Sequence, residues 1–202
     1  MKSCVVLCGG KGGRMGRDKG SLIIRGKPML FHVLDTLENI VDDLVLVLGN
    51  QGQVERYKNI LYTKNYENIH LRIYKDKIIN QGPLGGILTG LLNIKSEYAL
   101  VLPCDSPLIS TDFILKMYEH SEKENFDAVI PQWDNGYIEP LHSIYKKEVT
   151  KIIDILLLQG KRDIRSLIGK LNVRYVNVKI LDKTTNSFKN INTIEDYLSF
   201  NL

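Results

Sequence analysis

Apolar runs and amphipathic stretches alternate along this chain from its first residues. Residues 3–8 (SCVVLC), 44–49 and 98–105 are short and almost continuously apolar, which is typical of strands buried on both faces. The segments after the first and second of these strands, residues 29–40 and 52–63, have apolar side chains at helical spacing. This alternation is the pattern of βαβ units around a mostly parallel sheet. We therefore predict an α/β fold with three αβα layers around a Rossmann-like open sheet.

The second half of the chain continues the same alternation. Strands are predicted at 71–76 and 126–133, and the segment 140–159 passes from a strand into a helix. The other predicted elements are a loop and helix at 82–94, helices at 112–124, 162–171 and 193–200, and a last strand at 173–181. Because no repeat, low-complexity tract or linker interrupts this order, we expect residues 1–202 to form a single domain.

Composition and charge narrow the class of protein. The chain has 202 residues, of which 44% are hydrophobic and 25% charged, as in soluble globular domains. Its net charge of +4 favours an anionic ligand but is too small for a nucleic-acid-binding surface. No apolar run is long enough to span a membrane, and the first residues lack the pattern of a secretory signal. We therefore expect a cytoplasmic protein without a nucleic-acid or membrane partner.

The cysteines and histidines form no reactive motif in the sequence. Cys4, Cys8 and Cys104 are an odd number without a CxxC pair, so they predict reduced thiols and neither a disulfide framework nor a zinc cluster. The four histidines show no metal-ligand spacing and accompany no GxSxG segment; they are His32, His70, His120 and His142. We expect each histidine to be a surface or packing residue, which argues against a hydrolase.

A glycine-rich and cation-rich loop, LCGGKGGRMGRDKG at 7–20, follows the first predicted strand. No Gly-Lys pair in the chain is followed by Ser or Thr, so the loop is not a Walker phosphate loop. A GxGxxG fingerprint begun at Gly10 would need glycine at position 15, where Met15 stands. The second strand ends in Gly49 and Asn50 with no acid to hold a ribose diol, which disfavours a nicotinamide enzyme.

The composition of this loop still suits a phosphate ligand. Glycines allow consecutive backbone N–H groups to converge on an anion, and Arg14 and Lys19 can neutralise phosphate charge. A nucleoside triphosphate is the natural ligand for such a loop. Taken alone, the loop is equally compatible with a surface segment whose cations are solvated.

A carboxylate follows the strand in LVLPCDSPLIS. Asp105 stands at the expected carboxyl end of that strand, with Pro103 and Pro107 stiffening the backbone on either side. In open parallel sheets ligands bind at the carboxyl ends of the strands, and a carboxylate beside a phosphate loop is a hard oxygen ligand for Mg²⁺. The alternative is an Asp-Ser-Pro turn that only precedes a helix.

A second glycine-rich segment, QGPLGGILTGL at 81–91, begins a predicted helix. Its glycines would let the backbone pass close to a flat base or a ribose, and a tight helix–sheet contact explains them equally well. Asp76 lies just upstream, at the end of the third predicted strand, and is a candidate acceptor for guanine or ribose. The alternative for Asp76 is a solvated loop charge.

Five segments in this order resemble one known family. The segments LCGGKGGRMGRDKG, DKIINQGPLGG, LPCDSPLIS, IEPLHSIY and NINTIEDY are similar to those of the MobA-like molybdenum cofactor guanylyltransferases, which have the nucleotide-diphospho-sugar transferase fold. The resemblance runs from residue 3 to about residue 198. It implies transfer of GMP from GTP to the terminal phosphate of molybdopterin, release of pyrophosphate, and dependence on Mg²⁺, with Mn²⁺ as a candidate alternative ion.

The resemblance also implies roles for individual positions. Cys8 stands where the family usually has alanine, and Ile194 stands where it usually has proline. The implied catalytic residues are Arg14, Lys19 and Asp105, with Asp105 as metal ligand, and the implied GTP-binding residues are Leu7, Cys8, Gly9, Lys19, Asn50, Asp76 and Asp105.

The acceptor is expected on the carboxy-terminal half of the chain. Asn190 and Asn192 in KNINT offer polar groups for molybdopterin. Lys161, Arg162 and Arg165 are further candidates for an anionic acceptor, although a solvated basic helix face is the more common role of such a run. The expected partners are GTP and molybdopterin as substrates, with molybdenum insertion proteins or recipient molybdoenzymes as further candidates, and the protein is expected to be a monomer.

Two alternative functions stay open at this stage. The first is another nucleotidyltransferase of the same fold, using CTP with molybdopterin or a nucleoside triphosphate with a sugar or polyol phosphate. The LCGG and GPLGG segments favour guanine over cytosine within the resemblance. The second is a non-catalytic nucleotide-binding regulator or adaptor, against which Lys19 and Asp105 argue, because a pure binder needs no metal ligand beside the α-phosphate.

Overall fold

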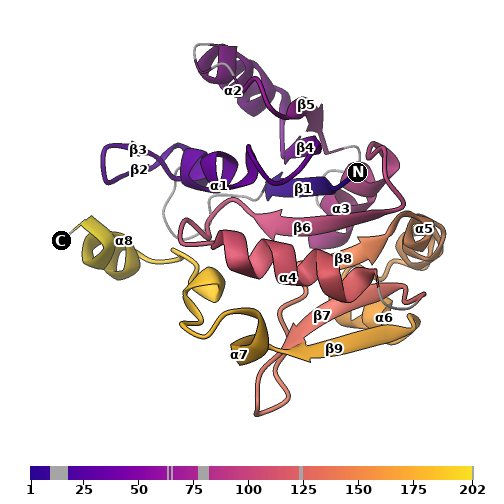
Figure 1. The fold of residues 1–202 in the computed structure, drawn as a ribbon. Helices are drawn as coiled ribbons and strands as arrows, with labels where there is room; N and C mark the ends of the chain where they lie inside the picture. Colours follow the sequence, from indigo (N-terminus) through magenta and orange to yellow (C-terminus); the bar gives the residue numbers. More distant parts are fainter. Residues whose placement is uncertain (10–17, 63, 65, 77–81, 123–124, 202) are drawn as a thin grey trace.

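The predicted open sheet is present, and in the part of the chain described by the structure it contains seven strands (Figure 1). The structure is a computed structural model that describes residues 1–9, 18–62, 64, 66–76, 82–122 and 125–201. The strand order is β5-β4-β1-β6-β8-β7-β9. The strands are β1 (Ser3–Cys8), β4 (Asp43–Leu48), β5 (His70–Lys75), β6 (Tyr98–Pro103), β7 (Ala128–Gln132), β8 (Ser143–Lys146) and β9 (Val173–Asn177).

The central strand β1 lies between two parallel neighbours. Val5 pairs with Val45 of β4 on one side and with Val101 of β6 on the other. All other pairs are parallel except those of β8, which runs antiparallel to both β6 and β7. The mostly parallel sheet is therefore confirmed. The direction in which successive strands are added reverses between β1 and β6, so their carboxyl ends flank the crevice where ligands of such sheets bind.

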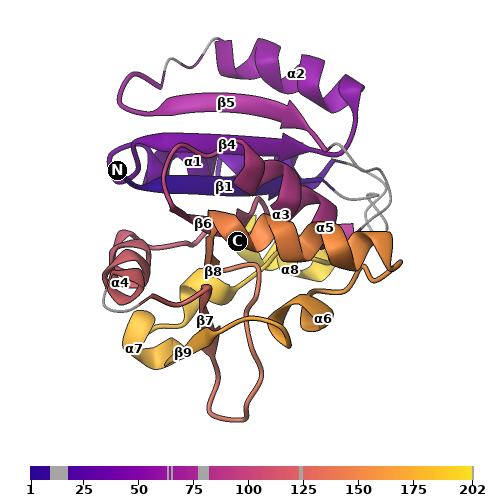
Figure 2. The same cartoon turned by 90° about the vertical axis from the view of Figure 1, so that its right-hand side faces the viewer.

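Helices cover both faces of the sheet and complete the three layers (Figures 1 and 2). Side chains of β1 alternate between the two cores, with Cys4, Val6 and Cys8 on one face and Val5 on the other. The first face carries α1 (Met29–Leu37), α2 (Gln51–Tyr62) and α4 (Thr111–Ser121), and the second carries α3 (Gly82–Leu92), α5 (Thr150–Leu158) and α6 (Ile164–Ile168).

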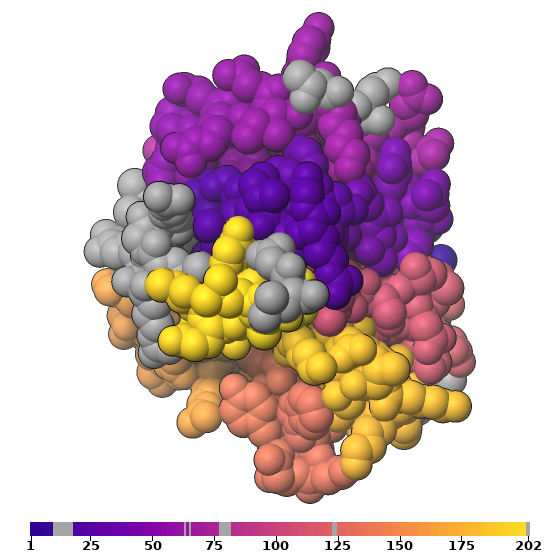
Figure 3. All heavy atoms as spheres, turned by 90° about the vertical axis from the view of Figure 1, so that its left-hand side faces the viewer, coloured from indigo at the N-terminus to yellow at the C-terminus, as the bar shows by residue number. Residues whose placement is uncertain are grey.

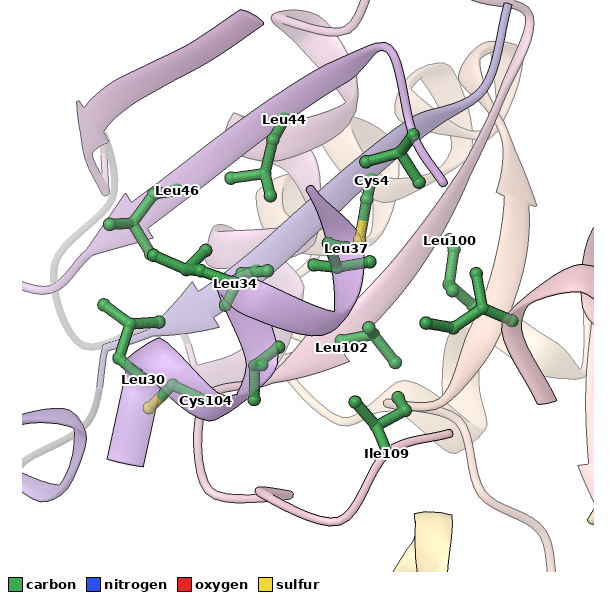
Figure 4. Close-up of a cluster of buried hydrophobic side chains, with 14 of the residues drawn as sticks. Cys4, Leu30, Leu34, Leu37, Leu44, Leu46, Leu100, Leu102, Cys104 and Ile109 are labelled. Carbon is green, nitrogen blue, oxygen red and sulfur yellow. The ribbon is translucent and has the colours of Figure 1, made fainter. Parts of the chain in front are cut away.

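The larger core lies under α1 (Figure 4). Leu30, Leu34 and Leu37 recur at helical spacing on the buried side of α1. They pack against the cluster that contains Leu44 and Leu46 of β4. Both helix and strand therefore show the burial that their apolar patterns predict. No helix in the described residues is long and apolar enough to cross a membrane.

A short hairpin and the last helix form a smaller unit beside the sheet. The hairpin joins β2 (Ile23–Ile24) and β3 (Lys27–Pro28), and its two turn residues both have positive φ, 46° at Arg25 and 82° at Gly26. Helix α8 (Ile194–Asn201) packs on it, and Tyr197 Oη donates to the carbonyl oxygen of Ile23 at 2.8 Å. The hairpin is absent from the sequence prediction because each of its strands has only two residues.

The predicted strand at 173–181 is wrong in its second half. Strand β9 ends at Asn177, and the short helix α7 (Val178–Leu181) follows at once. The side chain of Asn177 accepts a hydrogen bond from the amide of Lys179 at 2.9 Å and so caps this helix. Three single-turn 3-10 helices complete the described elements: η1 (Lys19–Ser21), η2 (Lys147–Val149) and η3 (Asn186–Phe188).

Gly90 tests how closely α3 packs on the central strand. A Cβ atom at Gly90 would lie against Val5 Cγ1 and 2.8 Å from its Cγ2. We expect Gly90→Ala to lower the free energy of unfolding by about 1–3 kcal/mol, because overpacking outweighs the helix propensity of alanine of about 1 kcal/mol.

The matched control is Gly52→Ala on the exposed side of α2. A Cβ atom there would meet Asn50 Oδ1 at 3.4 Å, an ordinary contact. Urea unfolding should show unchanged or slightly raised stability for this variant. Equal effects of the two substitutions would contradict the close approach of α3 to β1.

Candidate active site

The carboxyl ends of β1 and β6 lie side by side, at the edge of the sheet toward which both arrows point in Figure 1. The amide of Cys104 donates to the carbonyl oxygen of Leu7 at 3.0 Å, which continues the pairing of the two strands to their ends. Cys8 and Gly9 therefore leave β1 beside Asp105, which follows β6. These residues were all predicted to lie in the site. Figure 3 shows α8 and the segment before it (yellow) against the N-terminal part of the chain (indigo) at this edge.

Lys19, Asp105 and Asn192 form one hydrogen-bonded cluster. Lys19 Nζ donates to Asp105 Oδ2 at 2.9 Å and to Asn192 Oδ1 at 2.7 Å. The Lys19 and Asp105 side chains are 28% and 15% exposed, so the ion pair lies in a partly buried position at the edge of the sheet. Lys19 thus joins two other predicted site residues that are far from it in the sequence.

The segment before α8 is attached directly to the turn that carries Asp105. The amide of Ile191 donates to the carbonyl oxygen of Asp105 at 2.9 Å. Its neighbour Asn190 accepts a hydrogen bond from Ser106 Oγ through Oδ1 at 2.5 Å. Asn190, Ile191 and Asn192 therefore each contact a different residue of the site. Their role in binding an acceptor stays a prediction.

Asp105 offers a carboxylate that could hold a metal ion at the carboxyl end of β6. The described residues contain no group of three or more His, Cys, Asp and Glu side chains that could enclose an ion. Mg²⁺ usually takes one or two carboxylates and completes its shell with water and substrate phosphates. A single hard oxygen donor beside a lysine fits an ion that arrives with a triphosphate, and it does not fit a closed structural metal site.

The end of β4 approaches Gly9 on the other side of β1. A Cβ atom at Gly9 would lie 3.2 Å from the amide nitrogen of Gly49, a tight contact with backbone that favours glycine at this position. Asn50 Oδ1 accepts from the amide of Gln53 at 3.0 Å, and Gln53 Oε1 accepts from the amide of Gly49 at 2.9 Å. The Asn50 contact caps α2, and the Gln53 contact ties the first turn of the helix to Gly49. Asn50 therefore has a structural role that its Asn-x-x-Gln spacing signals, beside the nucleotide contact predicted for it.

Asp76 lies at the same edge of the sheet but apart from Asp105. Its amide donates to the carbonyl oxygen of Leu48 at 2.7 Å, and its Oδ1 accepts from Thr89 Oγ1 of α3 at 3.2 Å. Strand order separates Asp76 from Asp105 by three inter-strand spacings, roughly 14 Å in all. The two carboxylates cannot hold one metal ion, whose ligands lie at about 2.0–2.1 Å. They can contact different parts of one extended ligand.

A buried polar contact supports the residue before Lys19. Tyr57 Oη of α2 donates to Asp18 Oδ1 at 3.1 Å and accepts from the Cys8 thiol at 3.8 Å. Arg56 lies 3.6 Å from Asp18 Oδ2, and the Asp18 side chain is only 9% exposed. Burial, together with Cys8 and Asp18, raises the pKa of Tyr57, which keeps its hydroxyl a donor. Asp18 and Tyr57 are absent from the sequence prediction, which offered no signal that joins them.

Four further cations were predicted to lie in or near the site. Arg14 lies outside the residues that the structure describes. Lys161, Arg162 and Arg165 are exposed around the start of α6, where Asp163 caps the helix by accepting from the amide of Ser166 at 2.8 Å. Their exposure agrees with a solvated basic face.

Comparison with known proteins finds a family whose model matches this chain. Residues 4–175 match the model of the family described as "MobA-like NTP transferase domain". A "Probable molybdenum cofactor guanylyltransferase" of Methanothermobacter thermautotrophicus is 37% identical over 97% of this chain and 97% of its own length. A protein of the same name from Methanocaldococcus jannaschii is 35% identical over 96% of this chain and 95% of its own.

A solved structure shows the same architecture. The crystal structure of "Molybdopterin-guanine dinucleotide biosynthesis protein A" from Archaeoglobus fulgidus superposes on this chain with a TM-score of 0.83 and 28% sequence identity. The similarity covers 98% of this chain and 96% of that one. The likeness therefore extends over the sheet, the helices and the segment that carries Asn190 and Asn192.

Tyr57→Phe tests the hydrogen bond from Tyr57 to Asp18, the residue before Lys19. Removing the hydroxyl leaves a buried carboxylate oxygen of Asp18 without its donor, so we expect the free energy of unfolding to fall by about 1–3 kcal/mol. The control is Tyr62→Phe in the same helix, where the side chain is 91% exposed and the change should stay within about 0.5 kcal/mol. Urea unfolding gives the free energy of unfolding of both variants. Equal values would show that the Tyr57–Asp18 contact does not stabilise the fold.

Proposed function

Because the chain belongs to the family of MobA-like NTP transferase domains, we propose that it transfers GMP from GTP to the terminal phosphate of molybdopterin and releases pyrophosphate. The observation that carries the proposal is the meeting of three motifs in one cluster. Lys19 of the first glycine-rich segment, Asp105 of LPCDSPLIS and Asn192 of NINTIEDY are joined by hydrogen bonds. The curated relatives that match nearly the whole chain carry the name of this activity.

Lys19 is placed to bind the phosphates of the nucleotide. An ammonium group has three N–H donors, and contacts within the described residues use two of them, to Asp105 and Asn192. The third donor can reach a phosphate oxygen while the first two hold the side chain in position. Its charge would stabilise the negative charge that develops on the departing pyrophosphate.

Asp105 is the residue that would hold Mg²⁺, or Mn²⁺ in its place, together with phosphate oxygens of GTP. The ion supplies charge neutralisation at the phosphates when bound. The backbone of Asp105 is fixed by the hydrogen bond from Ile191, and its carboxylate by Lys19. The protein therefore contributes a preorganised oxygen donor, which lowers the cost of assembling the site.

The chemistry needs positioning more than acid–base catalysis. The terminal phosphate of the acceptor attacks the α-phosphorus of GTP, the new P–O bond forms, and the bond to pyrophosphate breaks. A phosphate monoester has a second pKa of about 6 and is largely ionised at neutral pH, so no general base is required. Catalysis then consists of aligning two anionic substrates and neutralising their charge.

The two substrates are assigned to opposite sides of the cluster. The base and ribose of GTP are placed on the N-terminal half of the sheet, where Leu7 and Cys8 end β1, Gly9 follows it, and Asn50 and Asp76 follow β4 and β5. Molybdopterin is placed on the carboxy-terminal side, where Asn190 and Asn192 lie beside Asp105. The resemblance of the GTP-side segments to the family supports guanine as the base.

The cysteines fit the proposed location of the protein. Cys4, Cys8 and Cys104 are all free and buried. Burial raises the pKa of the Cys4 thiol well above its ordinary value, which keeps it unreactive. Such thiols agree with a reducing compartment, and we place the protein in the cytoplasm.

Asp105→Ala tests the proposed function at its central residue. We expect pyrophosphate release from GTP in the presence of molybdopterin and Mg²⁺ to fall by at least about 100-fold, because the variant lacks the carboxylate that shares the ion with the phosphates. Circular dichroism and thermal unfolding should show a retained fold.

The matched control is Asp112→Ala, which removes a carboxylate that is 68% exposed on α4 and pairs with Lys116. Pyrophosphate release should be unchanged in this variant. Wild-type turnover by Asp105→Ala would overturn the assignment of Asp105. A loss of activity in both variants would point to a general effect on stability.

A further inference from the structure

A buried chain of polar groups joins three of the motifs behind the acceptor side of the site. His142 Nε2 lies 2.9 Å from Ser106 Oγ, and Ser106 Oγ lies 2.5 Å from Asn190 Oδ1. The side chains of Ser106 and His142 are fully buried. His142 belongs to IEPLHSIY, Ser106 to LPCDSPLIS and Asn190 to KNINT. The sequence predicted His142 only as a packing or surface residue.

The ring of His142 is held by aromatic neighbours. It lies in edge-to-face geometry against Phe188, with centroids 5.5 Å apart, and against Phe113 at 6.4 Å. Burial lowers the pKa of His142 to about 3, so the imidazole is neutral at physiological pH. A neutral ring in a fixed orientation offers one donor nitrogen and one acceptor nitrogen.

The directions of the two hydrogen bonds follow from the atoms involved. Both partners of the Ser106–Asn190 contact are oxygens, so the single hydroxyl hydrogen of Ser106 points to Asn190 Oδ1. Ser106 Oγ must then accept from His142, whose Nε2 carries the hydrogen. The other nitrogen, Nδ1, has no hydrogen-bond partner in the described residues, and Glu139 Oε2 is 3.8 Å from it. With Oδ1 engaged, the NH₂ group of Asn190 is turned away from Ser106.

Asn190 also lines a groove of about 380 Å³. The groove lies between the turn at Leu108, the β2–β3 hairpin at Arg25, and α8. Arg25 and Lys189 bring positive charge to this groove. Asp196 is the acidic residue of its lining, and its Oδ2 accepts from the amides of Asn192 and Thr193 at 2.9 Å each. The groove therefore suits the anionic or oxygen-rich part of a ligand, and the NH₂ group of Asn190 is a donor for it.

We propose that His142 is a positioning residue for the acceptor: through Ser106 it fixes the carboxamide of Asn190 so that its NH₂ group donates to oxygen atoms of the acceptor. The inference rests on the proposed function, because it concerns the second substrate of the same reaction. His142 touches neither substrate. Its contribution is the orientation of an amide that would otherwise rotate between two nearly equivalent states.

Two variants, Ser106→Ala and His142→Phe, test whether His142 positions Asn190 or only fills space in the core. Ser106→Ala removes one buried oxygen, and His142→Phe keeps a ring between the aromatic neighbours. Each variant should raise KM for molybdopterin about tenfold while KM for GTP changes less than about twofold, because only the acceptor side loses an oriented donor. The double variant should equal the single ones, since both substitutions break the same chain of hydrogen bonds.

The controls address folding and donor chemistry. His142→Gln can restore a donor to Ser106 and should recover most of the lost affinity for molybdopterin. Phe188→Leu removes packing from the His142 ring without touching a hydrogen bond, so it should lower the melting temperature and leave the ratio of the two KM values unchanged. Nitrogen NMR of the wild type should report a neutral His142 with its hydrogen on Nε2.

The outcomes distinguish the two proposals. If the wild type releases no pyrophosphate from GTP and molybdopterin, the proposed function fails. If the wild type turns over and Ser106→Ala keeps its KM for molybdopterin, the positioning role of His142 is wrong. Additive effects in the double variant, or a hydrogen on Nδ1 of His142, would also overturn it.

Discussion

The parallel pairing of β1 with β6 sets the geometry on which the candidate site depends. It holds the ends of the two strands together, with the amide of Cys104 bound to the carbonyl oxygen of Leu7. The residues that follow, Gly9 and Asp105, therefore leave neighbouring strands at the point where strand order reverses. The register is fixed because alternate side chains of β1 enter two different cores. A slip of one residue would exchange the two sets and move every group of the site.

Much of the fold follows from the apolar pattern, and the failures have identifiable causes. Strands buried on both faces are almost continuously apolar, so β1, β4 and β6 could be predicted from the sequence. The run from Val173 to Leu181 looked like one strand because valine and isoleucine recur along its whole length, while the end of β9 depends on a cap formed by a single side chain, Asn177. The hairpin was missed because its strands are too short to show a period.

The site was predictable only in part, because motifs name residues but not their contacts. Lys19, Asp105 and Asn192 were each expected from the resemblance to a family, and the sheet brings them together. The contacts behind them were not expected. Tyr57 reaches Asp18 from a helix, and His142 reaches Ser106 from the bend just before β8, so both contacts arise from tertiary packing alone. Sequence spacing carries no signal for such pairs.

The central claim is that the Lys19–Asp105–Asn192 cluster serves transfer of a guanine nucleotide to the phosphate of molybdopterin. The most direct measurement is mass spectrometry of the product formed when the protein receives molybdopterin, Mg²⁺ and equal concentrations of GTP and CTP. The account predicts the guanine dinucleotide form of molybdopterin together with an equal amount of pyrophosphate. A cytosine dinucleotide as the main product, or nucleotide turnover without any dinucleotide, would contradict it.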